Sequence, residues 1–336
     1  MTLIILGMVG SAWAADGSAG YNKGFVIKEG DNSMKISGRV QPRYVFQSDG
    51  EFSELESAFE VTRARLKLGG TVMDPRISYF LQLDMGKGSV SLKDYLVSYD
   101  LTDSVRLTAG QFKRPGSRQQ MTSTSAIQLV ERSITDRAFG YGRDIGLMVG
   151  QDLGKEGGVE WALGLYNGTV DEGVFGPQLA FRAGAANSND VYKESDLGGG
   201  ALRWGVGGGA MATFDADDSD DGVLVANVDY IVKVNHFAHT GAIYARMDQD
   251  GDTYGDLAYS LMGFHAQAGY AVGGKVEPAA RLAMLVPAEG DSTTEIGAGV
   301  NVYFKGHNWK WQTDVNSVTT GDEQTLLGRS QLQLDF

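Results

Sequence analysis

Short segments in which apolar and polar residues alternate follow one another from residue 34 to the end of the chain. In residues 34–44 the even positions are mostly apolar and the odd positions are polar or cationic. Successive side chains of a β-strand point to opposite faces of a sheet, so each such strand has one apolar and one polar face. The alternation recurs in residues 64–68, 77–85, 159–165, 276–282, 296–304, 309–315 and 332–336. The pattern therefore predicts an all-β chain of about 16 strands, each roughly 10 residues long.

The number of strands indicates what the polar face meets. About 16 antiparallel strands that close into one barrel leave a lumen too wide for side chains to fill. The polar face then lines a water-filled lumen, and the apolar face meets lipid. Turn signals such as 74–75 and 305–306 alternate with longer polar stretches such as 289–294. Short turns at one end and longer loops at the other are typical of a transmembrane antiparallel β-barrel.

The first residues predict export. Residues 3–9 are apolar, and Ala12-x-Ala14 fits a signal-peptidase site. We expect a signal peptide over 1–14 and a single barrel domain over 15–336; a buried N-terminal strand or helix is the alternative. No Lys or Arg precedes the apolar run, so the true start could lie upstream. The terminal aromatic Phe336 resembles the recognition signal of bacterial outer-membrane barrels, which makes that membrane and its lipid the expected environment.

Composition excludes several classes of protein. The 336 residues contain no Cys, which excludes a disulfide framework, a Cys-based zinc site and a thiol nucleophile. A net charge of −13 argues against general nucleic-acid binding. The four His stand at no recognisable nucleophile spacing, so we expect no enzyme activity and no cofactor. Residues 248–256 faintly resemble a calcium loop but lack the glutamate that completes one, and we expect a solvated loop without a metal.

A series of motifs in the first half of the chain points to one family. In order, they are GRVQ at 38–41, FEVTRARLKLGG at 59–70, LKDYLVSY at 92–99, GQFKRP at 110–115, ER at 131–132, RDIG at 143–146 and YNG at 166–168. Their order and spacing resemble the phosphate-selective porin O and P family of Gram-negative outer membranes.

The resemblance implies a trimeric, 16-stranded porin whose long third loop, here residues 113–143, folds into the lumen. It also implies that basic residues near the constriction, here Lys113 and Arg132, hold anions. Two features depart from the family: Gly116 stands where Phe is frequent, and the chain as a whole is acidic.

The charges are divided unevenly along the chain. Residues 1–150 carry 18 Lys and Arg against 16 Asp and Glu, whereas residues 151–336 carry 11 against 26. By the alternation, the wet face of the first strands carries Lys35, Arg39, Arg43, Arg63, Arg65, Lys67 and Arg106. The expected constriction loop adds Lys113, Arg114, Arg118, Arg132, Arg137 and Arg143. Three acidic residues, Asp84, Asp94 and Asp100, should also face the lumen and pair with some of these cations.

A row of Arg along a pore can pass an anion from site to site. The sequence therefore predicts an outer-membrane porin, self-associated as a homotrimer, for passive diffusion of small hydrophilic solutes and ions, with a preference for anions such as phosphate. The same cations could instead form a pairing network that holds the long loop in place. The acidic stretches 215–221 and 248–256 would attract cations within a Debye length of about 8–10 Å. A general or weakly cation-selective porin, and a structural barrel without an open pore, therefore remain alternatives.

Overall fold

The computed structural model describes residues 17–151, 157–168, 170–171, 174–214, 222–249 and 257–336. The expected signal peptide, residues 1–14, lies outside this part of the chain. Sixteen strands form the barrel: β3 (Asn32–Asp49), β4 (Leu55–Val72), β5 (Asp74–Asp84), β6 (Ser91–Asp100), β7 (Arg106–Lys113), β8 (Arg143–Gly150), β9 (Gly158–Tyr166), β12 (Gln178–Ala186), β13 (Arg203–Thr213), β14 (Val223–Val234), β15 (Phe237–Gln249), β16 (Leu257–Tyr270), β17 (Val276–Pro287), β18 (Thr293–Lys305), β19 (Trp309–Thr320) and β20 (Glu323–Asp335).

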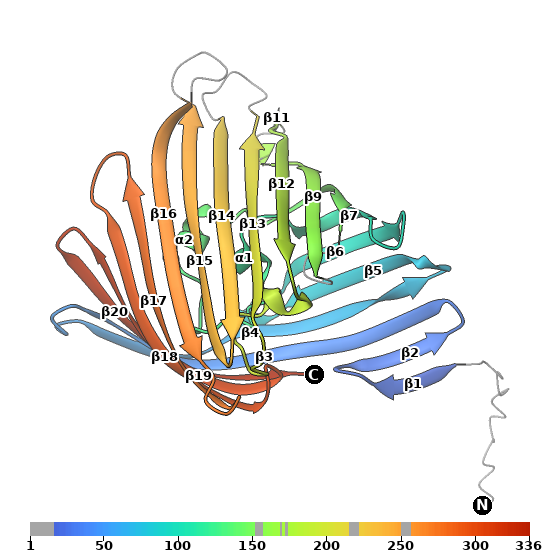
Figure 1. Cartoon of the computed structure of the whole chain (residues 1–336), viewed down its shortest axis with the longest axis horizontal. Helices are drawn as coiled ribbons and strands as arrows, with labels where there is room; N and C mark the ends of the chain where they lie inside the picture. The colour runs from blue at the N-terminus through green and yellow to red at the C-terminus, as the bar shows by residue number, and fades with distance from the viewer. Residues whose placement is uncertain (1–16, 152–156, 169, 172–173, 215–221, 250–256) are drawn as a thin grey trace, which may run out of the picture.

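Antiparallel pairing closes these strands into a barrel. Each barrel strand pairs with the next one along the chain, and β9 pairs with β12 across the small hairpin of β10 (Val170–Asp171) and β11 (Val174–Phe175). The last strand, β20, returns to β3, with Asp335 opposite Arg39. The predicted 16-stranded antiparallel barrel is therefore confirmed (Figure 1).

The outer surface is apolar and the inner surface is polar. On the outer face Val228 is 62% exposed and Ile243 is 61% exposed, whereas the neighbouring inward residue Asp229 is 2% exposed. This is the reverse of a water-soluble protein, where Val and Ile are among the residues most often buried and Asp is mostly exposed. Such a surface suits a barrel surrounded by lipid.

A hairpin of β1 (Ser18–Tyr21) and β2 (Phe25–Glu29) extends the wall beside β3. Strand β2 pairs with the first residues of β3, from Asn32 to Ile36. Two residues later along β3, Gly38 and Phe336 exchange backbone hydrogen bonds of 2.8 and 3.0 Å. The first part of β3 therefore continues past the C-terminus of the chain.

The helices are short and lie in connections between strands. They are η1 (Gly86–Gly88), α1 (Arg118–Met121), α2 (Ile134–Phe139) and η2 (Asn189–Tyr192). Among the described residues no helix is long and apolar enough to cross a membrane.

Two long connections matter for the lumen: the 114–142 segment between β7 and β8, and the 187–202 segment between β12 and β13. In an antiparallel barrel successive connections lie at alternate ends. Counting from β3, these two follow an odd and an even strand, so they start from opposite ends of the barrel.

Candidate functional site

The backbone of the 114–142 segment is held by buried carboxylates. Four of its N–H groups donate to them: Arg118 to Asp229 at 2.9 Å, Gln128 to Glu194 at 2.8 Å, Val130 to Asp314 at 2.9 Å and Ile134 to Glu295 at 2.8 Å. The acceptors belong to β14, β18, β19 and the 187–202 segment. Hydrogen bonds to charged groups contribute about 1.5–3 kcal/mol each, so these four bonds fix the path of the segment.

Arginines of the first strands hold the same segment from the other side. Arg39 donates to the hydroxyls of Ser123, Thr124 and Ser125 at 3.1, 3.0 and 2.7 Å. Arg43 and Arg63 also bind the segment, through its Glu131. Three of the predicted pore cations therefore hold the segment in place.

Glu131 accepts hydrogen bonds of 2.6 Å from Arg43 and 2.9 Å from Arg63. Burial alone would raise the pKa of this carboxyl, but the two guanidiniums hold its pKa well below the usual range. Glu131 therefore stays charged and keeps both arginines neutralised.

The 187–202 segment meets the 114–142 segment from the opposite end of the barrel. Its Glu194 accepts from the Gln119 side chain at 3.0 Å and from the Gln267 side chain of β16 at 2.8 Å. The backbone N–H of Glu194 donates to the carbonyl of Ala126 at 2.9 Å. The two connections thus brace each other against one side of the barrel, and α1 and α2 lie behind β13–β16 in Figure 1.

Buried ion pairs line that side of the barrel. Arg182 and Asp229 are joined by bonds of 2.7 and 2.9 Å, Arg281 and Glu295 by one of 3.2 Å, and Arg329 and Asp314 by two of 2.7 and 2.8 Å. Part of the acidic excess of residues 151–336 is therefore used inside the barrel. We refer to the inner faces of β9–β20 with the two segments as the filled half.

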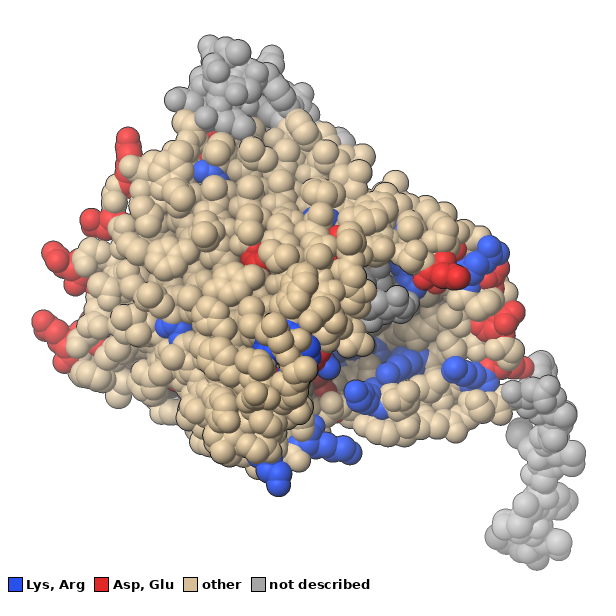
Figure 2. All heavy atoms as spheres, in the orientation of Figure 1, with Lys and Arg blue, Asp and Glu red and all other residues tan. Residues whose placement is uncertain are grey.

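The remaining half of the lumen contains a cavity of about 440 Å³ between the inner faces of β3–β8 and the 114–142 segment. We refer to this region as the open half. Eight of the predicted cations line the cavity: Arg39, Arg63, Arg65, Lys67, Arg106, Lys113, Arg132 and Arg143. In Figure 2, Lys and Arg side chains gather in a hollow beside the N-terminal strands.

A second cavity of about 500 Å³ adjoins the first and reaches the β1–β2 hairpin. The predicted residue Lys35 lines it, together with Lys28. Both cavities are lined by Lys67, Phe80, Leu96, Ser98 and Arg106. These five residues therefore lie where the two cavities of the open half meet.

The three predicted acidic residues each pair with a predicted cation. Asp84 lies 2.9 Å from Arg65, Asp94 lies 2.9 Å from Arg143, and Asp100 lies 2.6 Å from Arg106.

Lys113, Arg132 and Lys67, three other cations of the first cavity, differ in whether the protein uses their hydrogen-bond donors. Lys113 donates to the carbonyl of Gln120 at 2.6 Å, and Arg132 to that of Thr122 at 2.8 Å. Lys67 makes no hydrogen bond or ion pair with another described residue. The hydrogen-bond donors of its ammonium are therefore not used by another described residue.

Four predicted cations lie away from both cavities. Arg43 is buried with Glu131, and Arg114 lies 3.7 Å from Asp144. Arg118 is buried against Asp229 and over the ring of Tyr192, because the start of α1 points toward β14. Arg137 is exposed on α2.

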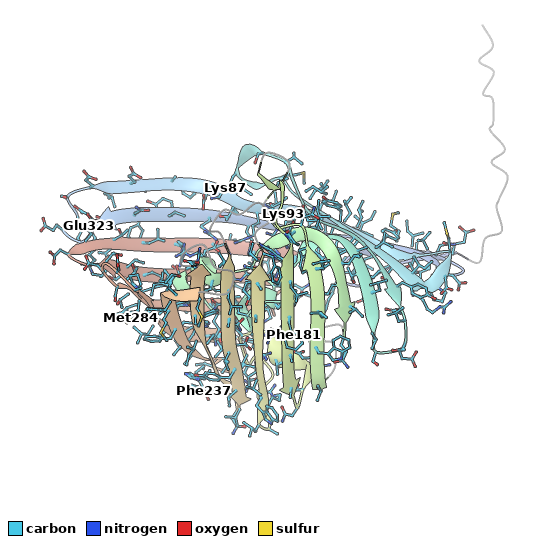
Figure 3. The ribbon with its side chains drawn as sticks, turned by 90° about the horizontal axis from the view of Figure 1, so that it is seen from above. Lys87, Lys93, Phe181, Phe237, Met284 and Glu323 are labelled. Atoms are coloured by element: carbon cyan, nitrogen blue, oxygen red, sulfur yellow. The ribbon has the colours of Figure 1, made fainter. Side chains whose placement is uncertain are left out.

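The acidic stretches 215–221 and 250–256 lie outside the described residues, so the candidate calcium loop is not described as a whole. Its first residue, Asp248, pairs with Arg246 at 2.7 Å. Other acidic residues, in the β3–β4 and β19–β20 connections and at the strand ends beside them, line an outer groove: Asp49, Glu51, Glu54, Glu56, Asp322 and Glu323. Figure 3 shows Glu323 at one end of the molecule.

Sequence reasoning missed two features of the lumen. The apolar side chains of Phe80 and Leu96 face the lumen. The alternation could have shown this, because Phe80 lies four residues before Asp84 and Leu96 two residues after Asp94, on the same strand faces. The 187–202 segment could have been noticed from its length and from the carboxylates of Asp190, Glu194 and Asp196.

Comparison with solved structures shows the same fold. An anion-selective porin from Comamonas acidovorans gives a TM-score of 0.65 at 11% identity, over 91% of this chain and 100% of that chain. A loop L8 deletion mutant of Vibrio cholerae OmpT gives 0.63 at 9% identity, over 90% and 99%. The trimer form of OmpT gives 0.61 at 10% identity, over 91% and 99%. No curated protein matches the chain.

A closed, 16-stranded barrel with a polar lumen and an apolar outer surface is the architecture of an outer-membrane porin, and this chain is one. Residues 34–198 match the family described as phosphate-selective porin O and P, which confirms the resemblance found in the motifs. Family and fold point to a channel rather than an enzyme.

Proposed function

We propose that this porin conducts small anions, phosphate among them, along the open half of its lumen. The observation that carries the proposal is the lining of the 440 Å³ cavity, where eight Lys and Arg outnumber the six carboxylates that pair with them, and Lys67 and Lys113 form no ion pair with a described carboxylate. Cations around a narrow aqueous path raise the local concentration of anions. The family description and the anion-selective neighbour from Comamonas acidovorans support the same direction.

The constriction in this proposal is built by both long connections. The 114–142 segment forms one side of the cavity, and the 187–202 segment supports it from the filled half. Solutes would then pass beside the segment. We also propose a homotrimer in outer-membrane lipid, since a trimer form of the structurally similar OmpT is known.

The test is the reversal potential of the reconstituted porin in a planar bilayer under a KCl gradient, followed by titration with phosphate. We expect anion selectivity and a block of the current by phosphate. Lys67→Glu should lower the anion-to-cation permeability ratio on the order of tenfold, because reversing a charge beside a permeating ion changes its energy by about 2 kcal/mol even in water.

Lys87→Glu is the matched control, because Lys87 is an exposed residue of η1 that lines neither cavity and lies at the edge of the molecule in Figure 3. It should leave the ratio almost unchanged. A cation-selective wild type without phosphate block would contradict the proposal. The acidic outer groove would then dominate, as in a general porin. A barrel with no conductance would be a structural protein.

A further inference from the structure

We infer that the open half takes organic anions that carry an apolar group, and favours them over anions of the same charge without one. The inference rests on the proposed function, because it concerns the same cavity. The observation behind it is an apolar site that lies beside the basic residues. An inorganic anion would not use this apolar site.

The apolar site lies on one row of the barrel wall. Phe80 of β5 stands directly opposite Leu96 of β6. In the same row the flanking positions are glycines: Gly69 precedes Phe80, and Gly110 and Gly146 follow Leu96. These glycines carry no side chain, so the two apolar groups form a shelf within this row, and Leu96 also packs against the buried cluster that contains Phe112.

The ring of Phe80 leans toward the basic strand β4. Its Cδ2 lies 3.0 Å from the position that a Cβ at Gly69 would occupy. Lys67 is two residues before Gly69 and therefore on the same face of β4. The geometry places an unpaired ammonium and an aromatic ring next to each other on the lumen wall.

Both groups lie where the two cavities join, since Lys67, Phe80 and Leu96 line each of them. A solute that follows the open half must pass this junction. Phe112, Met121 and Met148 add apolar surface to the first cavity. A basic side and an apolar side thus face the same path.

Such a lining distinguishes solutes by their apolar part. Apolar side chains in a water-filled lumen lose contact with water when an apolar group covers them, and this transfer is favourable. An alkyl or aryl carboxylate or phosphate would place its charge on Lys67 and its apolar group on Phe80 and Leu96. Inorganic phosphate makes only the first contact.

The experiment compares two phosphate monoesters of equal charge, methyl phosphate and phenyl phosphate, as blockers of the KCl current through the full-length porin in a planar bilayer. We expect phenyl phosphate to half-block at about a tenfold lower concentration than methyl phosphate, as covering one ring face predicts. Phe80→Ser should reduce this ratio to about threefold or less. Lys67→Gln should weaken the block by both esters and leave the ratio in place.

Val45→Ser is the matched control, because Val45 lies on the inner face opposite Arg329 and lines neither cavity. It should keep the wild-type ratio. If the Phe80→Ser porin does not insert into the bilayer, Leu96→Ser tests the same ratio of half-blocking concentrations. Equal half-blocking concentrations for the two esters, or an unchanged ratio in both Ser variants, would overturn the inference. If either of these results came with anion selectivity in KCl, the proposed function would still hold and only this inference would fail. Cation selectivity in KCl would instead overturn the proposed function itself.

Discussion

Arg182 and Asp229 in the filled half meet at 2.7 Å with exposures of 0% and 2%, whereas Arg106 and Asp100 in the open half meet at 2.6 Å with exposures of 26% and 32%. The two distances are nearly equal, but the surroundings differ. Water screens the second pair, and it cannot reach the first. The comparison teaches that the same type of ion pair can hold a barrel together in one half and lie beside a water-accessible cavity in the other.

Two lysines show the same contrast. Lys233 of β14 is fully buried and donates to the carbonyl of Asp190 at 2.8 Å and to that of Ser195 at 3.2 Å. Lys67 of β4 has no such partner among the described residues. A cation whose donors are used by the protein stabilises the protein, and a cation with free donors can bind a solute.

The largest expected effect is a loss of stability when a buried ion pair of the filled half is broken. Asp229→Asn leaves Arg182 and Arg118 without the charge that both of them face. Removing one partner of a buried ion pair costs about 3–5 kcal/mol, so we expect the free energy of unfolding to fall by that amount. Denaturant-induced unfolding of the porin in lipid vesicles measures it.

The matched variant is Asp100→Asn, which removes the same group from the hydrated pair with Arg106. Its cost should be at most about 1 kcal/mol, because solvent replaces most of the lost interaction. Equal losses in the two variants would show that the two halves do not differ in this way.

The parts of this architecture that depend on local pattern could be predicted from the sequence. The strand period follows from the alternation, the barrel from the number of strands, and the inward direction of Asp84, Asp94 and Asp100 from the alternation again. Each of these carboxylates then meets a cation on a neighbouring strand or at the start of β8. Short-range periodicity carries this information because successive strand residues alternate faces.

The filled half could not be predicted, because its contacts join residues far apart in the chain. The N–H groups of Val130 and Ile134 bind Asp314 and Glu295, more than 150 residues later. No spacing rule connects such positions. The same limit explains why Arg118 was expected along the pore with Lys113, although its helix points into the filled half.

A second prediction addresses how the filled half supports the open one. Glu194→Gln keeps the size of the side chain but removes the charge that accepts from Gln119, Gln128 and Gln267. We expect a loss of about 1.5–3 kcal/mol in unfolding free energy, in the range of a hydrogen bond to a charged group. The 114–142 segment should also hold its position less firmly, which single-channel recordings would show as a noisier current.

Asp190→Asn is the control, because Asp190 lies in the same segment but pairs with Lys233 and Arg203 rather than with the 114–142 segment. Its current should stay as steady as that of the wild type. Equal noise in the two variants would mean that the 187–202 segment does not support the constriction through Glu194.

The smallest effect lies at the boundary of the two halves, at Glu131. Its pKa is held well below the usual range by Arg63 and Arg43 against the opposing effect of burial. A carboxyl whose pKa is lower in the folded state adds stability above its unfolded pKa, near 4.3, and loses it as the pH falls through the folded value. Glu131→Gln should therefore reduce the unfolding free energy by about 1 kcal/mol at pH 7, and this difference from the wild type should shrink below about pH 4.

The same substitution should make the channel more anion-selective at pH 7, because Arg43 and Arg63 then lose the charge that neutralises them. Unfolding measured at pH 7, 4 and 3 tests the first effect, and the reversal potential in KCl tests the second. Comparing the variant with the wild type at each pH cancels the titration of every other group. A stability difference that is the same at pH 3 as at pH 7, with no change in selectivity, would mean that Glu131 fills space at this boundary and does not balance charge.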